Sequence, residues 1–150
     1  MRGNYYDIAI SDLHFAKVGM EADLGKDVEG YNSCAAGCTQ ASEKLLKHLF
    51  IIFNIPFELR LKESHNLNTL LRELVKDFPE LKKLTTQCRY LNDFYIEARY
   101  PGDNFEWIDY ETAKMCYDYA MDVKAGVDAI IESPANEKRL QEVLLNKYKR

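Results

Sequence analysis

The sequence predicts an all-α protein, an antiparallel up-and-down bundle of five core helices followed by a short C-terminal helix. Apolar residues recur at steps of three and four along several long segments, which is typical of helices that bury one face. All four prolines fall between these segments, where they end helices. No stretch shows a convincing strand pattern, an internal repeat or low complexity.

The length of 150 residues fits one ordinary domain. A chain of this size buries enough surface to hold a core without disulfide or metal support. The predicted division is a helical bundle over residues 1–133 and a basic C-terminal helix or tail over residues 134–150.

The first helix is predicted over residues 5–24, with Gly25 at the stop position. The second is predicted over residues 29–53, ended by Asn54 and Pro56. Small residues crowd its first half, and such residues allow a neighbouring helix to approach closely. Its second half carries a set of residues on the predicted polar side: Glu43, Lys44, Lys47 and His48.

The third helix is predicted over residues 66–77, after a loop over residues 55–64 in which Ser64 serves as N-cap. The fourth is predicted over residues 81–98, and its apolar spacing is typical of a bundle seam.

Residues 99–108 contain a proline, a glycine, an aspartate and an asparagine close together, and they predict a turn-rich loop. Asp109 is the predicted N-cap of the fifth helix, which reaches residue 132. A short amphipathic helix over residues 137–148 follows. The helical periods predict one shared core that includes Leu45, Leu49, Leu71, Leu91, Tyr95, Ala120 and Val127.

No apolar run approaches the length of a membrane helix, and the first residues lack the apolar core of a signal peptide. We therefore expect a cytoplasmic protein without membrane contact. The four cysteines lack the usual metal-site spacing, which favours buried, reduced thiols over a metal or redox role. No Gly-rich phosphate loop or Rossmann glycine pattern is present, so no cofactor and no metal are expected.

The formal net charge of −4 argues against a general nucleic-acid binder. Positive charge is nevertheless concentrated at the C-terminal end, so a local basic surface there is an alternative that the sequence leaves open. The charge counts favour the simpler interpretation of charges spread over solvated helix faces.

Three local strings occur in the order found in a known family. The second helix contains Gln-Ala-Ser-Glu-Lys-Leu-Leu-Lys at residues 40–47. Ser-His-Asn-Leu follows at residues 64–67, and Ala-Arg-Tyr-Pro-Gly stands at residues 98–102. Together these strings resemble the HEPN domain family, the "higher eukaryotes and prokaryotes nucleotide-binding" domains, over about residues 5–131.

The resemblance implies a five-helix bundle and a nucleotide- or RNA-related role. If the three strings converge in the fold, a ligand pocket is expected from Lys44, Lys47, His65, Arg99 and Tyr100. Cationic side chains beside an aromatic ring suit a phosphate and a stacked base. Taken singly, each of these residues is equally well interpreted as a helix cap, a solvated charge or a packed turn.

Many members of the family are metal-independent ribonucleases that use an arginine and a histidine separated by four to six residues. Histidine moves protons near neutral pH, and arginine stabilises the developing phosphorane charge. Arg99 lies in the corresponding region of this chain. The positions at which the histidine would stand hold Asn104, Phe105 and Glu106. Arg60 and His65 match the spacing, but in a different loop.

The leading hypothesis is therefore a non-catalytic HEPN module that binds a nucleotide, RNA or a partner protein. The resemblance implies a homodimer, and it suggests a separately encoded small nucleotidyltransferase as partner, as in toxin–antitoxin pairs. One alternative is a ribonuclease that uses His65 with Arg60 or Arg99. The other is a purely structural dimerisation domain. The sequence does not decide whether the small-residue face of the second helix packs within one chain or across a dimer.

Overall fold

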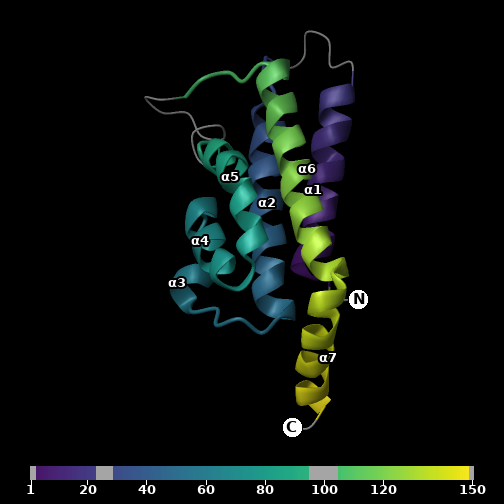
Figure 1. Cartoon of the computed structure of the whole chain (residues 1–150). Helices are drawn as coiled ribbons and strands as arrows, with labels where there is room; N and C mark the ends of the chain where they lie inside the picture. The colour runs from purple at the N-terminus through teal and green to yellow at the C-terminus, as the bar shows by residue number, and fades with distance from the viewer. Residues whose placement is uncertain (1–2, 23–28, 95–104, 149–150) are drawn as a thin grey trace.

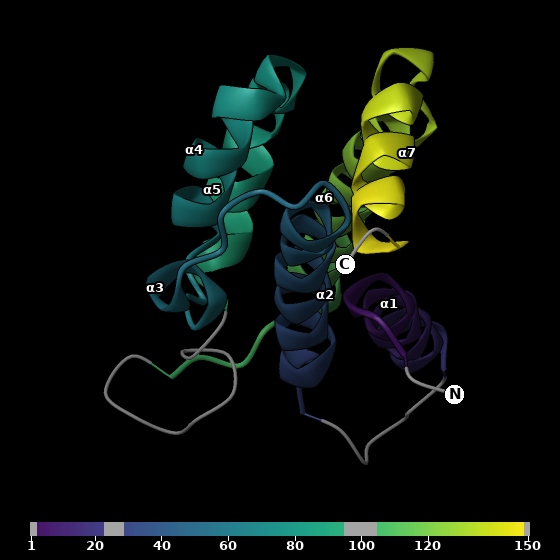
Figure 2. The same cartoon turned by 90° about the horizontal axis from the view of Figure 1, so that it is seen from below.

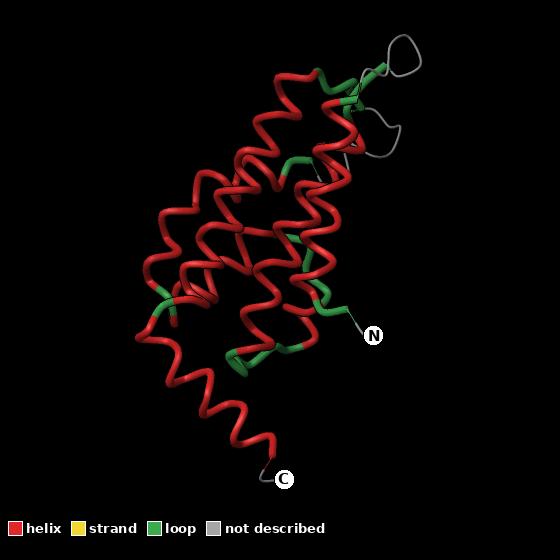
Figure 3. Tube along the Cα trace, turned by 90° about the vertical axis from the view of Figure 1, so that its right-hand side faces the viewer, coloured by secondary structure: helices red, strands yellow, loops and turns green. Residues whose placement is uncertain are grey.

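The computed structural model describes residues 3–22, 29–94 and 105–148, and these residues form helices and loops without any β-strand (Figure 3). The long helices are α1 (Tyr5–Glu21), α2 (Asn32–Ile52) and α6 (Tyr110–Glu132). The shorter elements are α3 (Leu59–Lys62), α4 (Leu67–Asp77), the 3₁₀ helix η1 (Pro79–Leu84), α5 (Thr85–Asn92) and α7 (Pro134–Tyr148). The predicted all-α helical bundle is confirmed.

Helix α2 lies at the centre of the bundle. It packs against α1 and α6 and also touches α4 and α5. Seen from below, α3, α4 and α5 lie on one side of α2, and α1 and α7 lie on the other (Figures 1 and 2). Because neighbours surround it, α2 buries polar residues as well as apolar ones.

The core joins buried residues from α1, α2, α4, η1, α5 and α6. Six of the seven predicted core residues are buried in it: Leu45, Leu49, Leu71, Leu91, Ala120 and Val127. The seventh, Tyr95, lies outside the described residues. Burial of these side chains supplies most of the driving force for folding.

The small residues of α2 pack within the chain, against α1. A Cβ atom added to Gly19 of α1 would lie 2.9 Å from the Cys34 sulfur, and one added to Gly37 would lie 4.0 Å from the Ala16 Cβ. Side chains of ordinary size would hold the two helices further apart. Within this chain, the small-residue face of α2 therefore packs against α1.

The end of α2 follows the rule for helix termini that the sequence indicated. Asn54 adopts a φ of 51°, in the left-handed region. The Ile55 N–H donates to the Phe50 carbonyl and the Asn54 N–H to the Ile51 carbonyl, at 2.9 and 3.3 Å. This pair of bonds is a Schellman motif, which satisfies carbonyls that the helix leaves open.

The structure corrects several predicted boundaries. The loop predicted over residues 55–64 contains the short helix α3, which has too few residues to show a helical period. Asn66, rather than Ser64, caps α4, because its side chain accepts from the N–H groups of Asn68 and Thr69. Asp109 caps α6 as predicted and accepts from the Thr112 N–H.

The predicted fourth helix over residues 81–98 is two elements. The first element is η1, which starts directly after Phe78. The second is α5, which follows η1 without a gap and ends at Asn92. The last predicted helix begins three residues early, at Pro134, because proline is well suited to the first helical turn. Helix α7 has no buried residue and extends past the lower end of the bundle (Figures 1 and 3).

Candidate functional site

A carboxylate on α2 joins two of the predicted site residues. One oxygen of Glu43 lies 2.8 Å from Nδ1 of His65, and the other accepts from the Lys47 ammonium at 3.2 Å. The side chains of Glu43 and Lys47 are only 10% and 4% exposed, whereas that of His65 is 53% exposed. His65 is thus the member of this cluster that faces solvent.

Helix periodicity explains how Glu43 and Lys47 reach the same place. They stand four residues apart, so their side chains lie on one face of α2, towards α3 and the start of α4. Lys47 also donates to the carbonyl of Lys62 at 2.8 Å. That carbonyl belongs to the last residue of α3, so the short helix missed by sequence analysis satisfies a buried ammonium group.

The start of α4 is held to the end of α5, and this contact positions His65. The side chain of Asn92 accepts from the Leu67 N–H at 2.9 Å, and Ser64 accepts from the Asn66 N–H at 3.1 Å. On α2, one turn before Glu43, the Thr39 hydroxyl donates to the Leu91 carbonyl at 2.6 Å. Three segments distant in sequence therefore meet beside His65.

Burial of Glu43, Lys47 and His48 corrects the assignment of these residues to a solvated polar side of α2. Lys47 and His65 come together through Glu43. Lys44 does not join them, because its ammonium pairs with Asp12 of α1 at 2.5 Å, on another side of α2.

The remaining predicted residues lie in two places. Arg60 is exposed on α3, and within the described part of the chain no hydrogen bond or ion pair involves its side chain. Arg99 and Tyr100 lie outside the described residues. Sequence reasoning included Glu43 in a family string but not in the site. The available signal was its four-residue spacing to Lys47, which places both side chains on one face of α2.

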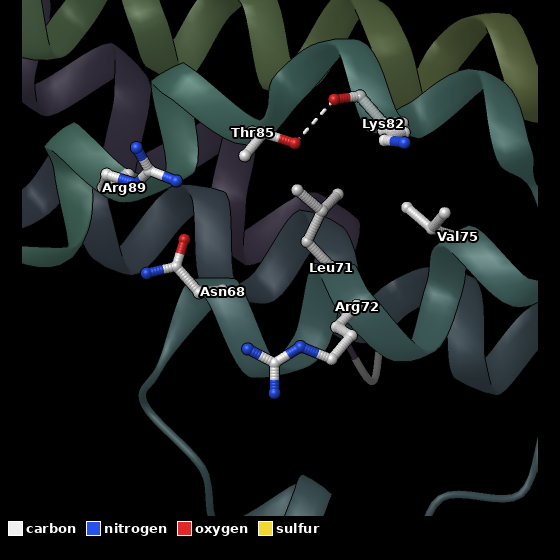
Figure 4. A pocket seen from close by; sticks show the side chains of 7 residues that line it. All are labelled: Asn68, Leu71, Arg72, Val75, Lys82, Thr85 and Arg89. Carbon is white, nitrogen blue, oxygen red and sulfur yellow. Dashed lines mark hydrogen bonds between the residues drawn. The ribbon is translucent and has the colours of Figure 1, made fainter.

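The structure also contains a cationic hollow that the sequence did not predict. A hollow of about 400 Å³ lies between α4 and the η1–α5 segment, and three cationic side chains line it: Arg72, Lys82 and Arg89 (Figure 4). Its lining residues come from three elements, α4, η1 and α5, and share no motif.

The cysteines offer no reactive centre. All four are free thiols, and Cys38, Cys88 and Cys116 are buried. Burial raises the pKa of Cys88 and of Cys116 to about 12, and it raises the pKa of Cys34 and Cys38 as well. Thiols of raised pKa hold little of the nucleophilic thiolate near neutral pH.

Across residues 3–22, 29–94 and 105–148, no three His, Cys, Asp or Glu side chains gather closely enough to hold a metal ion. In the same residues, no helix has the length and apolar character needed to cross a bilayer.

Comparison with known proteins places the chain in a family. No curated protein and no solved structure matches the chain significantly. The family model described as "HEPN domain" matches residues 4–129. This range begins beside α1, includes the Glu43–His65 pair and ends within the last turns of α6. The chain therefore belongs to the HEPN domain family.

Proposed function

We propose that this HEPN domain binds a nucleotide or RNA at the surface around His65, without cleaving it. One observation carries the proposal: the Glu43 carboxylate holds the exposed His65 ring at the point where α5 ends beside the start of α4. A polar ring held in place on an otherwise tightly packed bundle is suited to contact a ligand.

Arg99 and Tyr100 are the other residues proposed for this site. The chain leaves α5 at Asn92 and is described as far as Phe94, which lies five positions before Arg99. Asn92 is bonded to Leu67, two positions after His65, and we propose that Arg99 acts in this region. There its guanidinium would hold a phosphate and the Tyr100 ring would stack on a base.

Lys44 and Lys47 take supporting parts in this proposal. Lys47 neutralises Glu43, so the carboxylate adds little net negative charge beside His65. Lys44 faces α1 and pairs with Asp12 there, away from the His65 surface. Neither ammonium is assigned a direct contact with the ligand, which differs from the pocket expected from the sequence.

Binding to a 5′-labelled single-stranded RNA and to free nucleotides, followed by fluorescence anisotropy and calorimetry, tests the proposal. We expect saturable binding that weakens at least about tenfold in His65→Ala and in Arg99→Ala, equal to about 1.4 kcal/mol. His14→Ala is the matched control, since His14 is exposed on α1. Equal binding by the His65, Arg99 and His14 variants would contradict the assignment.

A second candidate function is metal-independent RNA cleavage, and the same Glu43–His65 contact favours it. A carboxylate bonded to one ring nitrogen orients an imidazole, as in hydrolase triads. Arg60 or Arg99 would then stabilise the phosphorane. The missing histidine at residues 104–106 weighs against this candidate. Cleavage of RNA in the presence of a chelator, abolished in His65→Ala, would place it first.

Self-association is also part of the proposal. Ile8, Phe15 and Val18 are exposed apolar residues on α1, and Phe15 is 70% exposed. Beside Phe15, a hollow of about 460 Å³ runs between α1 and α2. Burial of these side chains against a second copy would remove a contiguous apolar surface from water.

A homodimer would bury at least about 1,000 Å² in total. Light scattering at tens of micromolar should therefore give twice the mass of the 17.4 kDa chain, and Phe15→Ser should return it to the monomer mass. A monomeric parent protein would contradict the dimer and, with it, the purely structural role in dimerisation.

A separately encoded small nucleotidyltransferase is the proposed hetero-partner, to be tested by co-purification of the two chains.

A further inference from the structure

The hollow between α4 and the η1–α5 segment has the form of a small-molecule site. Its volume of about 400 Å³ falls within the range of ligand pockets in proteins. Asn68 and Arg72 stand one turn apart on α4 and therefore share a face, with Leu71 and Val75 beside them. The opposite wall consists of Lys82, Thr85 and Arg89.

Figure 4 shows how the polar groups are distributed. Asn68 and Arg89 lie towards the end of the hollow where α4 begins and α5 ends, and Arg72 lies further along α4, below Leu71. Lys82 lies at the other end, beside Val75. Leu71 and Val75 project between the two walls and give the hollow an apolar floor, and Leu71 is only 4% exposed.

The three cations of the hollow are not neutralised by nearby acids. The Glu73 carboxylate of α4 pairs with Lys76 at 3.0 Å, and Asp77 pairs with Arg139 of α7 at 3.5 Å. In the described part of the chain, no carboxylate forms an ion pair with Arg72, Lys82 or Arg89. Like charges that share a concave surface repel each other and attract anions. The concentration of positive charge is notable in a protein of net charge −4.

The chemistry of the lining selects the kind of anion. Two guanidinium groups offer planar forks that bind phosphate oxygens in pairs, and an ammonium group adds a point charge. The Asn68 amide lies beside the arginines and supplies a neutral donor. A diphosphate carries about three negative charges, which matches the three cations better than a dicarboxylate does.

We propose that this hollow binds a small ligand that carries a diphosphate group. Arg72 and Arg89 bind phosphate oxygens from the two walls of the hollow, and Lys82 holds the far end of the ligand. The apolar floor limits hydration of the bound anion and thereby strengthens these contacts. The site goes beyond the role proposed for His65, because none of its lining residues belongs to the Glu43–Lys47–His65 cluster.

Calorimetric titration of the full chain with inorganic pyrophosphate at low ionic strength tests the proposal. We expect one saturable site whose Kd rises at least about tenfold in Arg72→Gln and in Arg89→Gln, and severalfold in Lys82→Gln. Lys83→Gln is the matched control: it removes an exposed cation of the same 3₁₀ helix that does not line the hollow. All these side chains are exposed, so the variants should fold, which circular dichroism checks.

Competing anions decide the ligand class. Succinate should bind at least tenfold more weakly than pyrophosphate. A nucleoside diphosphate that binds more tightly than pyrophosphate through the same arginines would identify the source of the diphosphate as a larger molecule, and equal binding would identify the free ion. The proposal is overturned by absence of pyrophosphate binding, by equal affinity in the arginine variants, or by equal affinity for succinate. Displacement of pyrophosphate by stoichiometric single-stranded RNA would instead make the hollow part of a strand-binding surface.

Discussion

The Asn92 side chain, on the last residue of α5, accepts a hydrogen bond from the backbone N–H of Leu67, the first residue of α4, at 2.9 Å. This contact joins two residues that are 25 positions apart and closes the α4–α5 hairpin next to His65. It satisfies one of the N–H groups that every helix leaves without an internal partner at its start.

Substitution Asn92→Ala should lower the free energy of unfolding by about 1 kcal/mol, because the partly buried Leu67 N–H loses its acceptor. Asn92→Asp keeps an acceptor oxygen at the same place and should lose less. Urea denaturation of the two variants measures the difference. Equal stability of the alanine and aspartate variants would show that the bond contributes nothing to the hairpin.

Removal of one partner from the buried pair should be costly. Glu43→Leu leaves the Lys47 ammonium buried opposite only the Lys62 carbonyl, and a loss of about 3–5 kcal/mol is expected. The double variant Glu43→Leu/Lys47→Met should recover much of this loss, since no buried charge remains. A double-mutant cycle in urea gives the coupling energy.

The control for that cycle is the exposed pair of Lys114 and Asp118 on α6, which has the same four-residue spacing. Asp118→Leu should change stability by less than about 1 kcal/mol, because solvent screens exposed pairs. If Glu43→Leu lowers the free energy of unfolding as little as Asp118→Leu does, water solvates the Lys47 ammonium in the variant.

Stability should fall with pH below about 6.5 because of His48. Burial lowers the pKa of His48 from 6.5, and the nearby Asp7 only partly opposes this effect. Below pH 6.5 the unfolded chain therefore binds a proton that the folded protein does not. Stability is retained above this pH and decreases as the pH falls towards the folded pKa, by at most about 1.4 kcal/mol per unit.

Comparison of urea midpoints between pH 5 and pH 8 isolates this contribution. His48→Gln should flatten the decline below pH 6.5, whereas His14→Gln, on the exposed face of α1, should leave it unchanged. A parent protein and His48→Gln variant with parallel pH profiles would show that His48 does not carry the effect.

Helix α7 should be released by a change at one residue. The Arg139 guanidinium lies 5.4 and 5.3 Å from the ring centres of Phe53 and Phe78 and pairs with Asp77. Arg139→Ala should speed limited proteolysis within α7 several-fold, which corresponds to about 1 kcal/mol of lost docking. Lys138→Ala is the control, because Lys138 is exposed. Identical cleavage rates would place the attachment of α7 elsewhere.

The sequence predicted helices well wherever a long apolar period had to face a single core. The bounds of α2, α4 and α6 differ from the predictions by a few residues at most. The short elements could not be predicted, because too few residues form them. Helix α3 has four residues and cannot display a period, and the spacing of Leu81 and Leu84 fits η1 as well as an α-helix.

The candidate site was predicted less completely, because its residues depend on tertiary contacts. Glu43 resembles a surface residue until α3 and the loop before α4 cover it. Lys44 is its immediate neighbour in sequence, yet it faces α1. The cationic hollow could not be predicted for a similar reason, since Arg72 and Arg89 line one hollow only when α4 and α5 fold back as a hairpin.

The opposed directions of Glu43 and Lys44 have a thermodynamic consequence. Glu43 is bonded to His65, just before α4, and Lys44 is bonded to Asp12 of α1. Rotation of α2 about its axis would therefore break both contacts. The bond to Glu43 orients the His65 ring in the folded chain before the proposed ligand binds. Binding as proposed would then cost little side-chain entropy at His65, and a modest number of contacts would suffice for useful affinity.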